Sequence, residues 1–196
     1  MDKNKIKVFF DNISKTWDAD MIRSDEIINT ILENARVGKG TEVLDVACGT
    51  GILIPDYLKL EVKSVLGVDI SDKMLEIAES KFQQPNVKFI CQDAELYDFN
   101  QKVDAIVIYN AFPHFPNPEQ LIAHLSSFVK EGGTLTVAHG MSREEIDAHH
   151  RGPAKDVSMG LMTVENLAKI FEKYLKVTVT ISNDRMYQVV GCKTTL

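Results

Sequence analysis

Short apolar runs alternate with segments of helical periodicity along most of this chain. Five of these runs are rich in β-branched residues and almost continuously apolar, namely Thr41–Val46, Ser64–Asp69, Val87–Cys91, Val103–Tyr109 and Thr134–His139. Continuous apolar runs of this length are typical of parallel strands that are covered on both faces. They predict the central strands of a sheet buried between helices.

Helical patterns fall between and after these strands. Asp72–Phe82 has apolar residues four apart, and Ser71 can cap its first turn. A second helix is expected to begin at Pro118 and to end at Gly132–Gly133, and a third to cover Val164–Tyr174. Strand and helix alternate, so right-handed crossovers would build a doubly wound sheet.

Both ends of the chain depart from this alternation. Leu175–Ser182 and Met186–Cys192 are strand-like and are separated by Asn183–Asp184, which favours an antiparallel hairpin. Residues 1–35 have a helical pattern and must pack outside the sheet. The prediction is therefore an α/β domain whose seven-stranded sheet is mostly parallel and closes in a C-terminal antiparallel hairpin.

Composition narrows the possible functions. The 196 residues suit one domain, 1–196, and the net charge of −6 disfavours nucleic acid as a partner. The three cysteines are far apart, which favours neither a disulfide framework nor a cysteine zinc site. No apolar run has the length of a signal peptide or a membrane span, so a cytoplasmic location is expected.

A turn rich in small residues follows the first expected strand, in the segment VLDVACGTG. Small residues let the backbone approach a ligand closely, and ligands of open α/β sheets bind at the carboxyl ends of the strands. Asp69, which ends the second strand, suits ribose hydroxyls. Asp45, inside the turn segment, would repel a pyrophosphate but attract an ammonium or sulfonium. This favours S-adenosylmethionine over NAD.

Three motifs, taken together, resemble those of the class I S-adenosylmethionine-dependent methyltransferases. VLDVACGTG matches the first motif, with Ala47 where glycine is commoner; GVDIS at Gly67–Ser71 matches the second, and QDAELYDF at Gln92–Phe99 the third. The narrower likeness is to the small-molecule group that includes ubiquinone and menaquinone methyltransferases. The resemblance implies a Rossmann-like fold and methyl transfer to a small molecule.

The same resemblance implies a role for each matched residue. The methionine part of the cofactor would be surrounded by Asp45, Ala47, Gly49 and Gly51. Asp69 would bind the ribose hydroxyls, and Ile70 and Met74 would pack on the adenine. Asp93 would accept a hydrogen bond from the adenine amino group, and the Ala94 N–H would contact the adenine ring. The sulfonium end would lie near Asn110 and Ala111.

Four histidines are candidates for a catalytic base, namely His114, His139, His149 and His150. A neutral imidazole near the transferred methyl group could accept a proton from the nucleophile. A metal is the rival use, but the adjacent His149 and His150 would diverge by about 100° on a helix, and the acids of catechol-type methyltransferases are missing after the fourth strand. No metal site is therefore expected.

The remaining segments are assigned to the surroundings of the substrate. Residues 1–35, with Phe10 and Trp17, resemble a helical lid over the cofactor and substrate, and residues 141–162 form an insertion expected near the active site. Two alternatives stay open: a non-catalytic protein that binds S-adenosylmethionine, and, with less support, a nicotinamide-dependent dehydrogenase. The pattern identifies neither the acceptor atom nor the oligomeric state.

Overall fold

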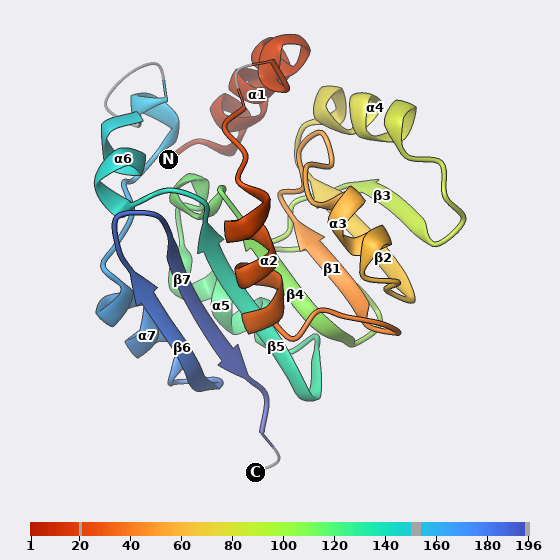
Figure 1. The fold of residues 1–196 in the computed structure, drawn as a ribbon. Helices are drawn as coiled ribbons and strands as arrows, with labels where there is room; N and C mark the ends of the chain where they lie inside the picture. Colours follow the sequence, from red (N-terminus) through yellow and green to blue (C-terminus); the bar gives the residue numbers. More distant parts are fainter. Residues whose placement is uncertain (20, 150–153, 195–196) are drawn as a thin grey trace.

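A computed structural model describes residues 1–19, 21–149 and 154–194. Its centre is a seven-stranded sheet in the order β3-β2-β1-β4-β5-β7-β6 (Figure 1). The strands are β1 Glu42–Val46, β2 Ser64–Asp69, β3 Val87–Cys91, β4 Val103–Tyr109, β5 Val129–His139, β6 Lys176–Ser182 and β7 Tyr187–Cys192. The predicted fold class is confirmed.

The strand order reverses between two central strands. β1 pairs in parallel with both β2 and β4, and β4 pairs in parallel with β5. β7 then pairs antiparallel with β5 and with β6, as the hairpin signal at Asn183–Asp184 predicted. Successive connections thus leave the β1–β4 boundary in opposite directions, which opens a crevice at the carboxyl ends of these two strands.

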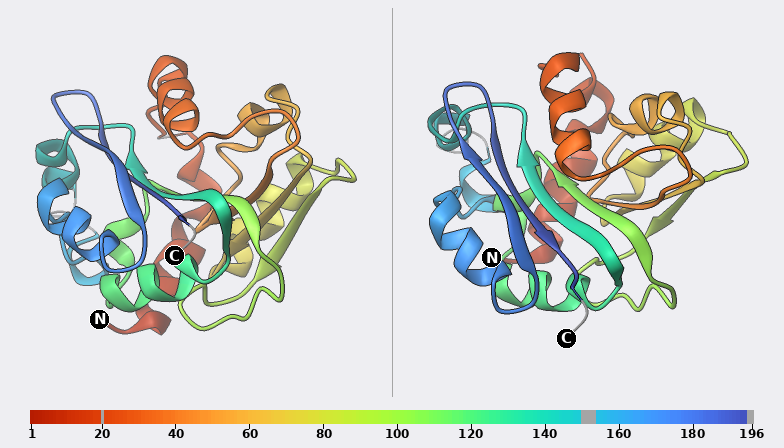
Figure 2. Two further views of the ribbon diagram at one scale, coloured as in Figure 1. Left: turned by 90° about the horizontal axis from the view of Figure 1, so that it is seen from below. Right: turned by 60° about the horizontal axis from the view of Figure 1, so that its bottom comes forward.

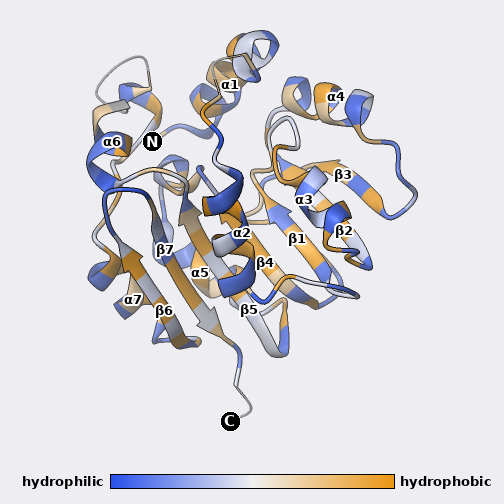
Figure 3. Cartoon of the chain, viewed as in Figure 1, coloured by the Kyte–Doolittle hydropathy of each residue, from blue (hydrophilic) through white to orange (hydrophobic). Residues whose placement is uncertain are grey.

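Helices cover both faces of the sheet (Figures 1 and 2). α2 (Asp25–Asn34) and α3 (Ile54–Lys59) share one core cluster, whereas α5 (Pro118–Ser126) and α7 (Val164–Phe171) share the other. Figure 3 shows the central strands as largely apolar and the helices as two-sided. This pattern is what strands buried on both faces require.

The other helices border the carboxyl edge of the sheet. They are α1 (Lys3–Trp17), α4 (Asp72–Lys81), α6 (Arg143–His149) and the short 3₁₀ turns η1 (Phe112–His114) and η2 (Lys155–Val157). As predicted, Ser71 caps α4 by accepting a hydrogen bond from the N–H of Met74. Within the described ranges, no helix combines the length and apolarity needed to cross a membrane.

The boundary between α5 and β5 differs from the prediction. The helix ends at Ser126 and the strand begins at Val129, so Gly132–Gly133 lie inside β5 and not at a helix exit. The register shifts between the β4 partners Val129 and Thr134, and Gly132 adopts φ 76° within this irregularity. A bulge of this kind needs a residue that tolerates positive φ, so the glycines allow the bulge in β5 and do not end a helix.

α2 is joined to the last strand by a buried amide. The Gln188 side chain, on β7, is 0% exposed. Its Nε2 donates to the carbonyl of Ile31 at 3.0 Å, and its Oε1 accepts from Asn34 Nδ2 at 2.8 Å. α2 therefore packs on the face of the sheet, and of the expected 1–35 lid only α1 lies at the carboxyl edge.

Candidate active site

A cavity lies in the crevice above β1, β2 and β4. Its wall combines the turn after β1, the start of the segment after β2, the loop after β3 and the segment after β4, and α1 completes it. Of the residues expected to bind the cofactor, those on this wall are Ala47, Gly49, Asp69, Ile70, Met74, Asp93, Ala94, Asn110 and Ala111. The topology thus brings together three motifs that are separated along the chain.

The turn after β1 is strained on the side of the cavity. Ala47 and Gly49 both have φ 55°, a region that costs a residue with a side chain about 1–2 kcal/mol. A Cβ built on Gly49 meets no atom within 4 Å, so it would project into open space at the cavity wall. Gly51 is different because its missing side chain makes room for Phe82, at 2.8 Å, and it does not line the cavity.

Asp69 organises the boundary between the first two motifs. Its Oδ2 accepts from the N–H of Gly49 and its Oδ1 from the N–H of Ser71, both at 2.9 Å. Burial raises the pKa of Asp69, and these backbone hydrogen bonds counteract part of that rise. Each carboxylate oxygen has a second lone pair, so the group can still accept from a ligand hydroxyl.

Asp45 is buried next to the cavity but does not line it, and it is 2% exposed. Within the described residues its Oδ2 makes no hydrogen bond, and the same holds for the hydroxyl of Tyr57. Burial, and secondarily the charge of Asp69, raises the pKa of Asp45 to about 8. Such a group is an uncompensated acceptor beneath the turn of the first motif.

The loop after β3 carries two acids, and a lysine of α1 contacts both. Lys3 Nζ lies 2.5 Å from Asp93 Oδ2 and 2.5 Å from Glu95 Oε2. Glu95 is 3% exposed, and its second oxygen, Oε1, forms no hydrogen bond in the described part of the chain. All three residues line the cavity.

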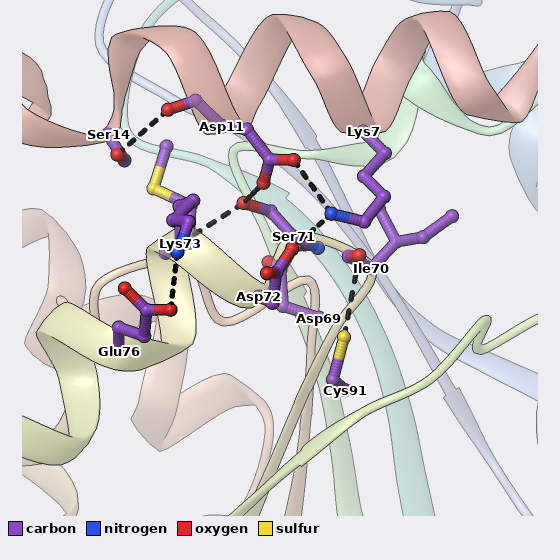
Figure 4. A network of polar contacts seen from close by, with 11 residues as sticks. Lys7, Asp11, Ser14, Asp69, Ile70, Ser71, Asp72, Lys73, Glu76 and Cys91 are labelled. Atoms are coloured by element: carbon purple, nitrogen blue, oxygen red, sulfur yellow. Dashed lines mark hydrogen bonds and ion pairs between the residues drawn. The ribbon is translucent and has the colours of Figure 1, made fainter.

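α1 is also joined to the two other cofactor motifs. Lys7 pairs with Asp11 at 2.7 Å and with Asp72, and Ser71 Oγ donates to Asp11 Oδ1 at 2.6 Å (Figure 4). At the other end of the helix, Thr50 Oγ1 donates to Asp18 at 2.5 Å. α1 is therefore held at three points across the cavity.

Aromatic side chains wall the part of the cavity beyond the glycine turn. Phe10 and Trp17, expected in a lid, line it and pack edge to face with ring centroids 5.7 Å apart. The His114 ring lies 5.0 Å from Phe10, and its Nδ1 is 2.7 Å from the carbonyl oxygen of Val157. A carbonyl only accepts, so the neutral ring has its proton on Nδ1 and its lone pair on Nε2.

The other histidine candidates do not join His114 on the cavity wall. His139 is 2% exposed, packs edge to face on Tyr187 and does not line the cavity, because the last residue of β5 is still within the paired sheet. His149 ends α6, but its side chain lies outside the described part of the structure, as does the whole of His150. From the segment expected near the active site, 141–162, the backbone carbonyl of Val157 contacts His114.

Three polar residues of this site were not anticipated from the sequence. They are Lys3, Asp11 and Glu95, and their partners lie up to 92 residues away along the chain. One signal was present, because Lys3, Lys7 and Asp11 are four apart and share a face of α1. Among the described residues, no group of three or more His, Cys, Asp or Glu is arranged to hold a metal ion.

Comparison with known proteins finds methyltransferases among both family models and sequence relatives. Residues 43–133 match the family model described as a methyltransferase domain. A ubiquinone biosynthesis O-methyltransferase of Coxiella burnetii is 31% identical over 143 residues, which cover 69% of this chain and 61% of that protein. A malonyl-[acyl-carrier protein] O-methyltransferase of Acetivibrio thermocellus is 29% identical over 138 residues, which cover 69% of this chain and 49% of that protein. The chain thus spans less than two thirds of these curated relatives.

Solved structures share this fold. Magnesium protoporphyrin IX methyltransferase from Synechocystis PCC 6803, solved with S-adenosylhomocysteine, has a TM-score of 0.74 at 16% identity and covers 99% of this chain and 100% of its own. The N-methyltransferase NodS from Bradyrhizobium japonicum has a TM-score of 0.69 at 13% identity, with 87% of each chain covered. At such identities the likeness shows the fold. The family itself rests on the domain match, the sequence relatives and the three motifs, which show that this chain belongs to the class I S-adenosylmethionine-dependent methyltransferases.

Proposed function

We propose that this chain binds S-adenosylmethionine in the cavity and transfers its methyl group to a small-molecule acceptor. The observation that carries the proposal is the convergence of Gly49, Asp69 and Asp93, one from each motif, on one cavity at the point where the strand order reverses. Ligands of open α/β sheets bind at such points.

The residues present fit this cofactor at three places. The open space at the Gly49 Cβ position leaves room for a ligand against the backbone of the turn. Asp69 can accept from the ribose hydroxyls with the lone pairs that Gly49 and Ser71 do not use. Asp45 provides a buried carboxyl oxygen that a cationic amino group would satisfy, directly or through a water.

When bound, S-adenosylmethionine supplies a methyl group on a positively charged sulfur, which is open to in-line displacement. The chain's own residues then have two tasks. Phe10 and Trp17 exclude water from the acceptor side, which favours the aligned nucleophile over solvent. His114 would have its own proton on Nδ1, so its Nε2 would take the proton that a hydroxyl group loses when it accepts the methyl group.

The acceptor belongs to the same proposal. Both sequence relatives cited above are named as O-methyltransferases. A hydroxyl or carboxyl oxygen is therefore the first acceptor class to assay, and His114 is a suitable base for a hydroxyl group.

Calorimetric titration with S-adenosylmethionine, S-adenosylhomocysteine and NAD tests the cofactor. We expect micromolar binding of the first two, lost in Asp69→Ala and kept in Asp184→Ala, which changes an exposed acid in the β6–β7 turn. Failure of folded wild-type protein to bind S-adenosylmethionine, or a preference for NAD, would overturn the proposal. Binding without turnover on any oxygen, nitrogen, sulfur or carbon acceptor would instead favour a non-catalytic binding protein.

A further inference from the structure

A side groove lies between η1 and residues 158–162, outside the cavity assigned to the cofactor. Its volume is about 660 Å³, which is within the range of small-molecule sites. Phe115 lines both spaces, whereas His114 lines only the cofactor cavity and Phe112 and Pro113 line only the groove. The side groove is therefore a neighbour of the proposed active site and not a part of it.

Hydrogen bonds fix the shape of the side groove. The N–H of Met159 donates to the carbonyl of Pro113 at 2.9 Å, which ties residues 158–162 to η1. The N–H of Leu161 donates to Asp147 Oδ1 at 3.0 Å, and the carbonyl of Leu161 accepts from Arg143 Nε at 2.7 Å, so the same segment is also tied to α6. A groove that is already formed costs a ligand less ordering entropy.

Arg143 is anchored in this groove by one nitrogen and keeps its other two available. Nε holds the carbonyl of Leu161, whereas Nη2 lies 3.7 Å from Asp147 Oδ2, which is an ion pair too long for a hydrogen bond. Within the described residues, neither Nη1 nor Nη2 donates a hydrogen bond. The side chain is 35% exposed and lines the groove. A guanidinium oriented in this way presents a planar pair of donors, which matches a carboxylate.

The rest of the lining combines apolar surface with one more cation. Met159 is 62% exposed and, with Met162, gives the groove an apolar wall. Lys155 also lines the groove, is exposed and forms no ion pair in the described part of the chain. Arg143 and Lys155 face one acid, Asp147, so the lining has a single net positive charge. It suits a ligand with an apolar body and one negative charge.

We propose that the side groove binds a small amphiphilic carboxylate, with its charged group on the Arg143 donors near Lys155 and its apolar body against Met159 and Met162. A carboxylate has the one charge that balances the lining, whereas a phosphate dianion would exceed it beside Asp147. An uncharged apolar ligand would cover the guanidinium without pairing with it, which is costly.

Methionine methyl groups provide the assay, because they report separately on the two spaces. Met159 and Met162 line the side groove, whereas Met21 and Met74 line the cofactor cavity. The methyl groups are labelled with ¹³C, followed by NMR and assigned from single Met→Leu variants. Titration with 4-phenylbutanoate should shift the signals of Met159 and Met162 and leave those of Met21 and Met74 in place. The uncharged 4-phenylbutanamide should bind at least about tenfold more weakly, since it lacks charge-assisted hydrogen bonds.

Two variants test the cations. Arg143→Gln should weaken 4-phenylbutanoate about tenfold and leave the amide unchanged, so that the preference for the carboxylate is lost. Lys155→Gln changes an exposed side chain and should weaken the carboxylate about threefold. Lys176→Gln is the matched control, because Lys176 is exposed at the start of β6 and forms no ion pair among the described residues. It should change neither affinity.

Equal binding of the carboxylate and the amide to the wild type would overturn the proposal. Shifts at Met21 and Met74 in place of Met159 and Met162 would do the same, because the probe would then occupy the cofactor cavity. So would a full preference in folded Arg143→Gln; if that variant does not fold, unchanged carboxylate affinity in Lys155→Gln decides against the groove. Titration with S-adenosylhomocysteine should move Met21 and Met74, and its failure would refute the proposed function alone.

Discussion

Replacement of Asp45 by asparagine should change how the stability of the ligand-free protein depends on pH. The pKa of this carboxyl is raised from 3.8 to about 8 by burial and by the charge of Asp69. Between these two values the unfolded chain has released the proton that the folded chain still holds. The unfolded state therefore binds fewer protons, and the free energy of unfolding falls as the pH rises through this window.

The size of the effect follows from the shift. Each pH unit within the window costs at most about 1.4 kcal/mol, so the wild type should lose up to about 3 kcal/mol between pH 5 and pH 7 through this one group. That is a large part of the stability of an ordinary domain, about 5–15 kcal/mol. Asp45→Asn removes the titrating group and keeps a side chain of the same shape. Between pH 5 and pH 7 the variant should therefore lose less free energy of unfolding than the wild type, by up to about 3 kcal/mol.

The assay is urea unfolding followed by far-UV circular dichroism at pH 5, 6, 7 and 8. The absolute stabilities are not the readout, because the asparagine amide brings donors of its own into the site. The difference between the two proteins as a function of pH isolates Asp45, since Asp69 and the histidines are present in both. Parallel curves for wild type and variant would refute the reasoning and would mean that Asp45 is ionised in the folded protein.

Two further predictions concern the cavity wall. His114→Gln should lower kcat about a hundredfold or more with a protonated hydroxyl acceptor, while the affinity for S-adenosylhomocysteine stays the same, and an unchanged kcat would exclude His114 as the base. Gly49→Ala should weaken S-adenosylhomocysteine at least tenfold in calorimetry, because the new methyl group would take the space beside the turn and add backbone strain at φ 55°; wild-type affinity would show that the ligand does not approach this backbone.

The sheet was predictable because its strands are buried on both faces and carry long apolar runs. The same rule explains the error at β5. The segment around Gly132–Gly133 has little apolar character, so the local pattern assigned it to a helix exit. In the structure the glycines lie between two residues paired with β4, Val129 and Thr134, and exchange backbone hydrogen bonds with Lys193. α2 was assigned to the lid for a similar reason, because nothing within Asp25–Asn34 shows that its partner is β7.

In the candidate site too, residues in local motifs were predictable, whereas residues defined by distant contacts were not. Asp69 and Gly49 were predictable because each belongs to a short motif that can be recognised from neighbouring residues alone. Both residues line the cavity. Lys3 and Glu95 were missed because their pairing joins segments 92 residues apart, which no local periodicity reveals. His139 was a candidate through its place at the end of a strand, but the ring turns into the core against Tyr187.

Two earlier parts of the chain depend on β7 for their packing partner. β7 lies between β5 and β6 although it follows both of them along the chain, and Gln188 on it completes the hydrogen bonds of α2, which precedes the whole sheet in the sequence. Until β7 pairs, β5 presents an unpaired edge and α2 lacks its buried partner. A chain cut before residue 187 would therefore expose strand edges that invite aggregation.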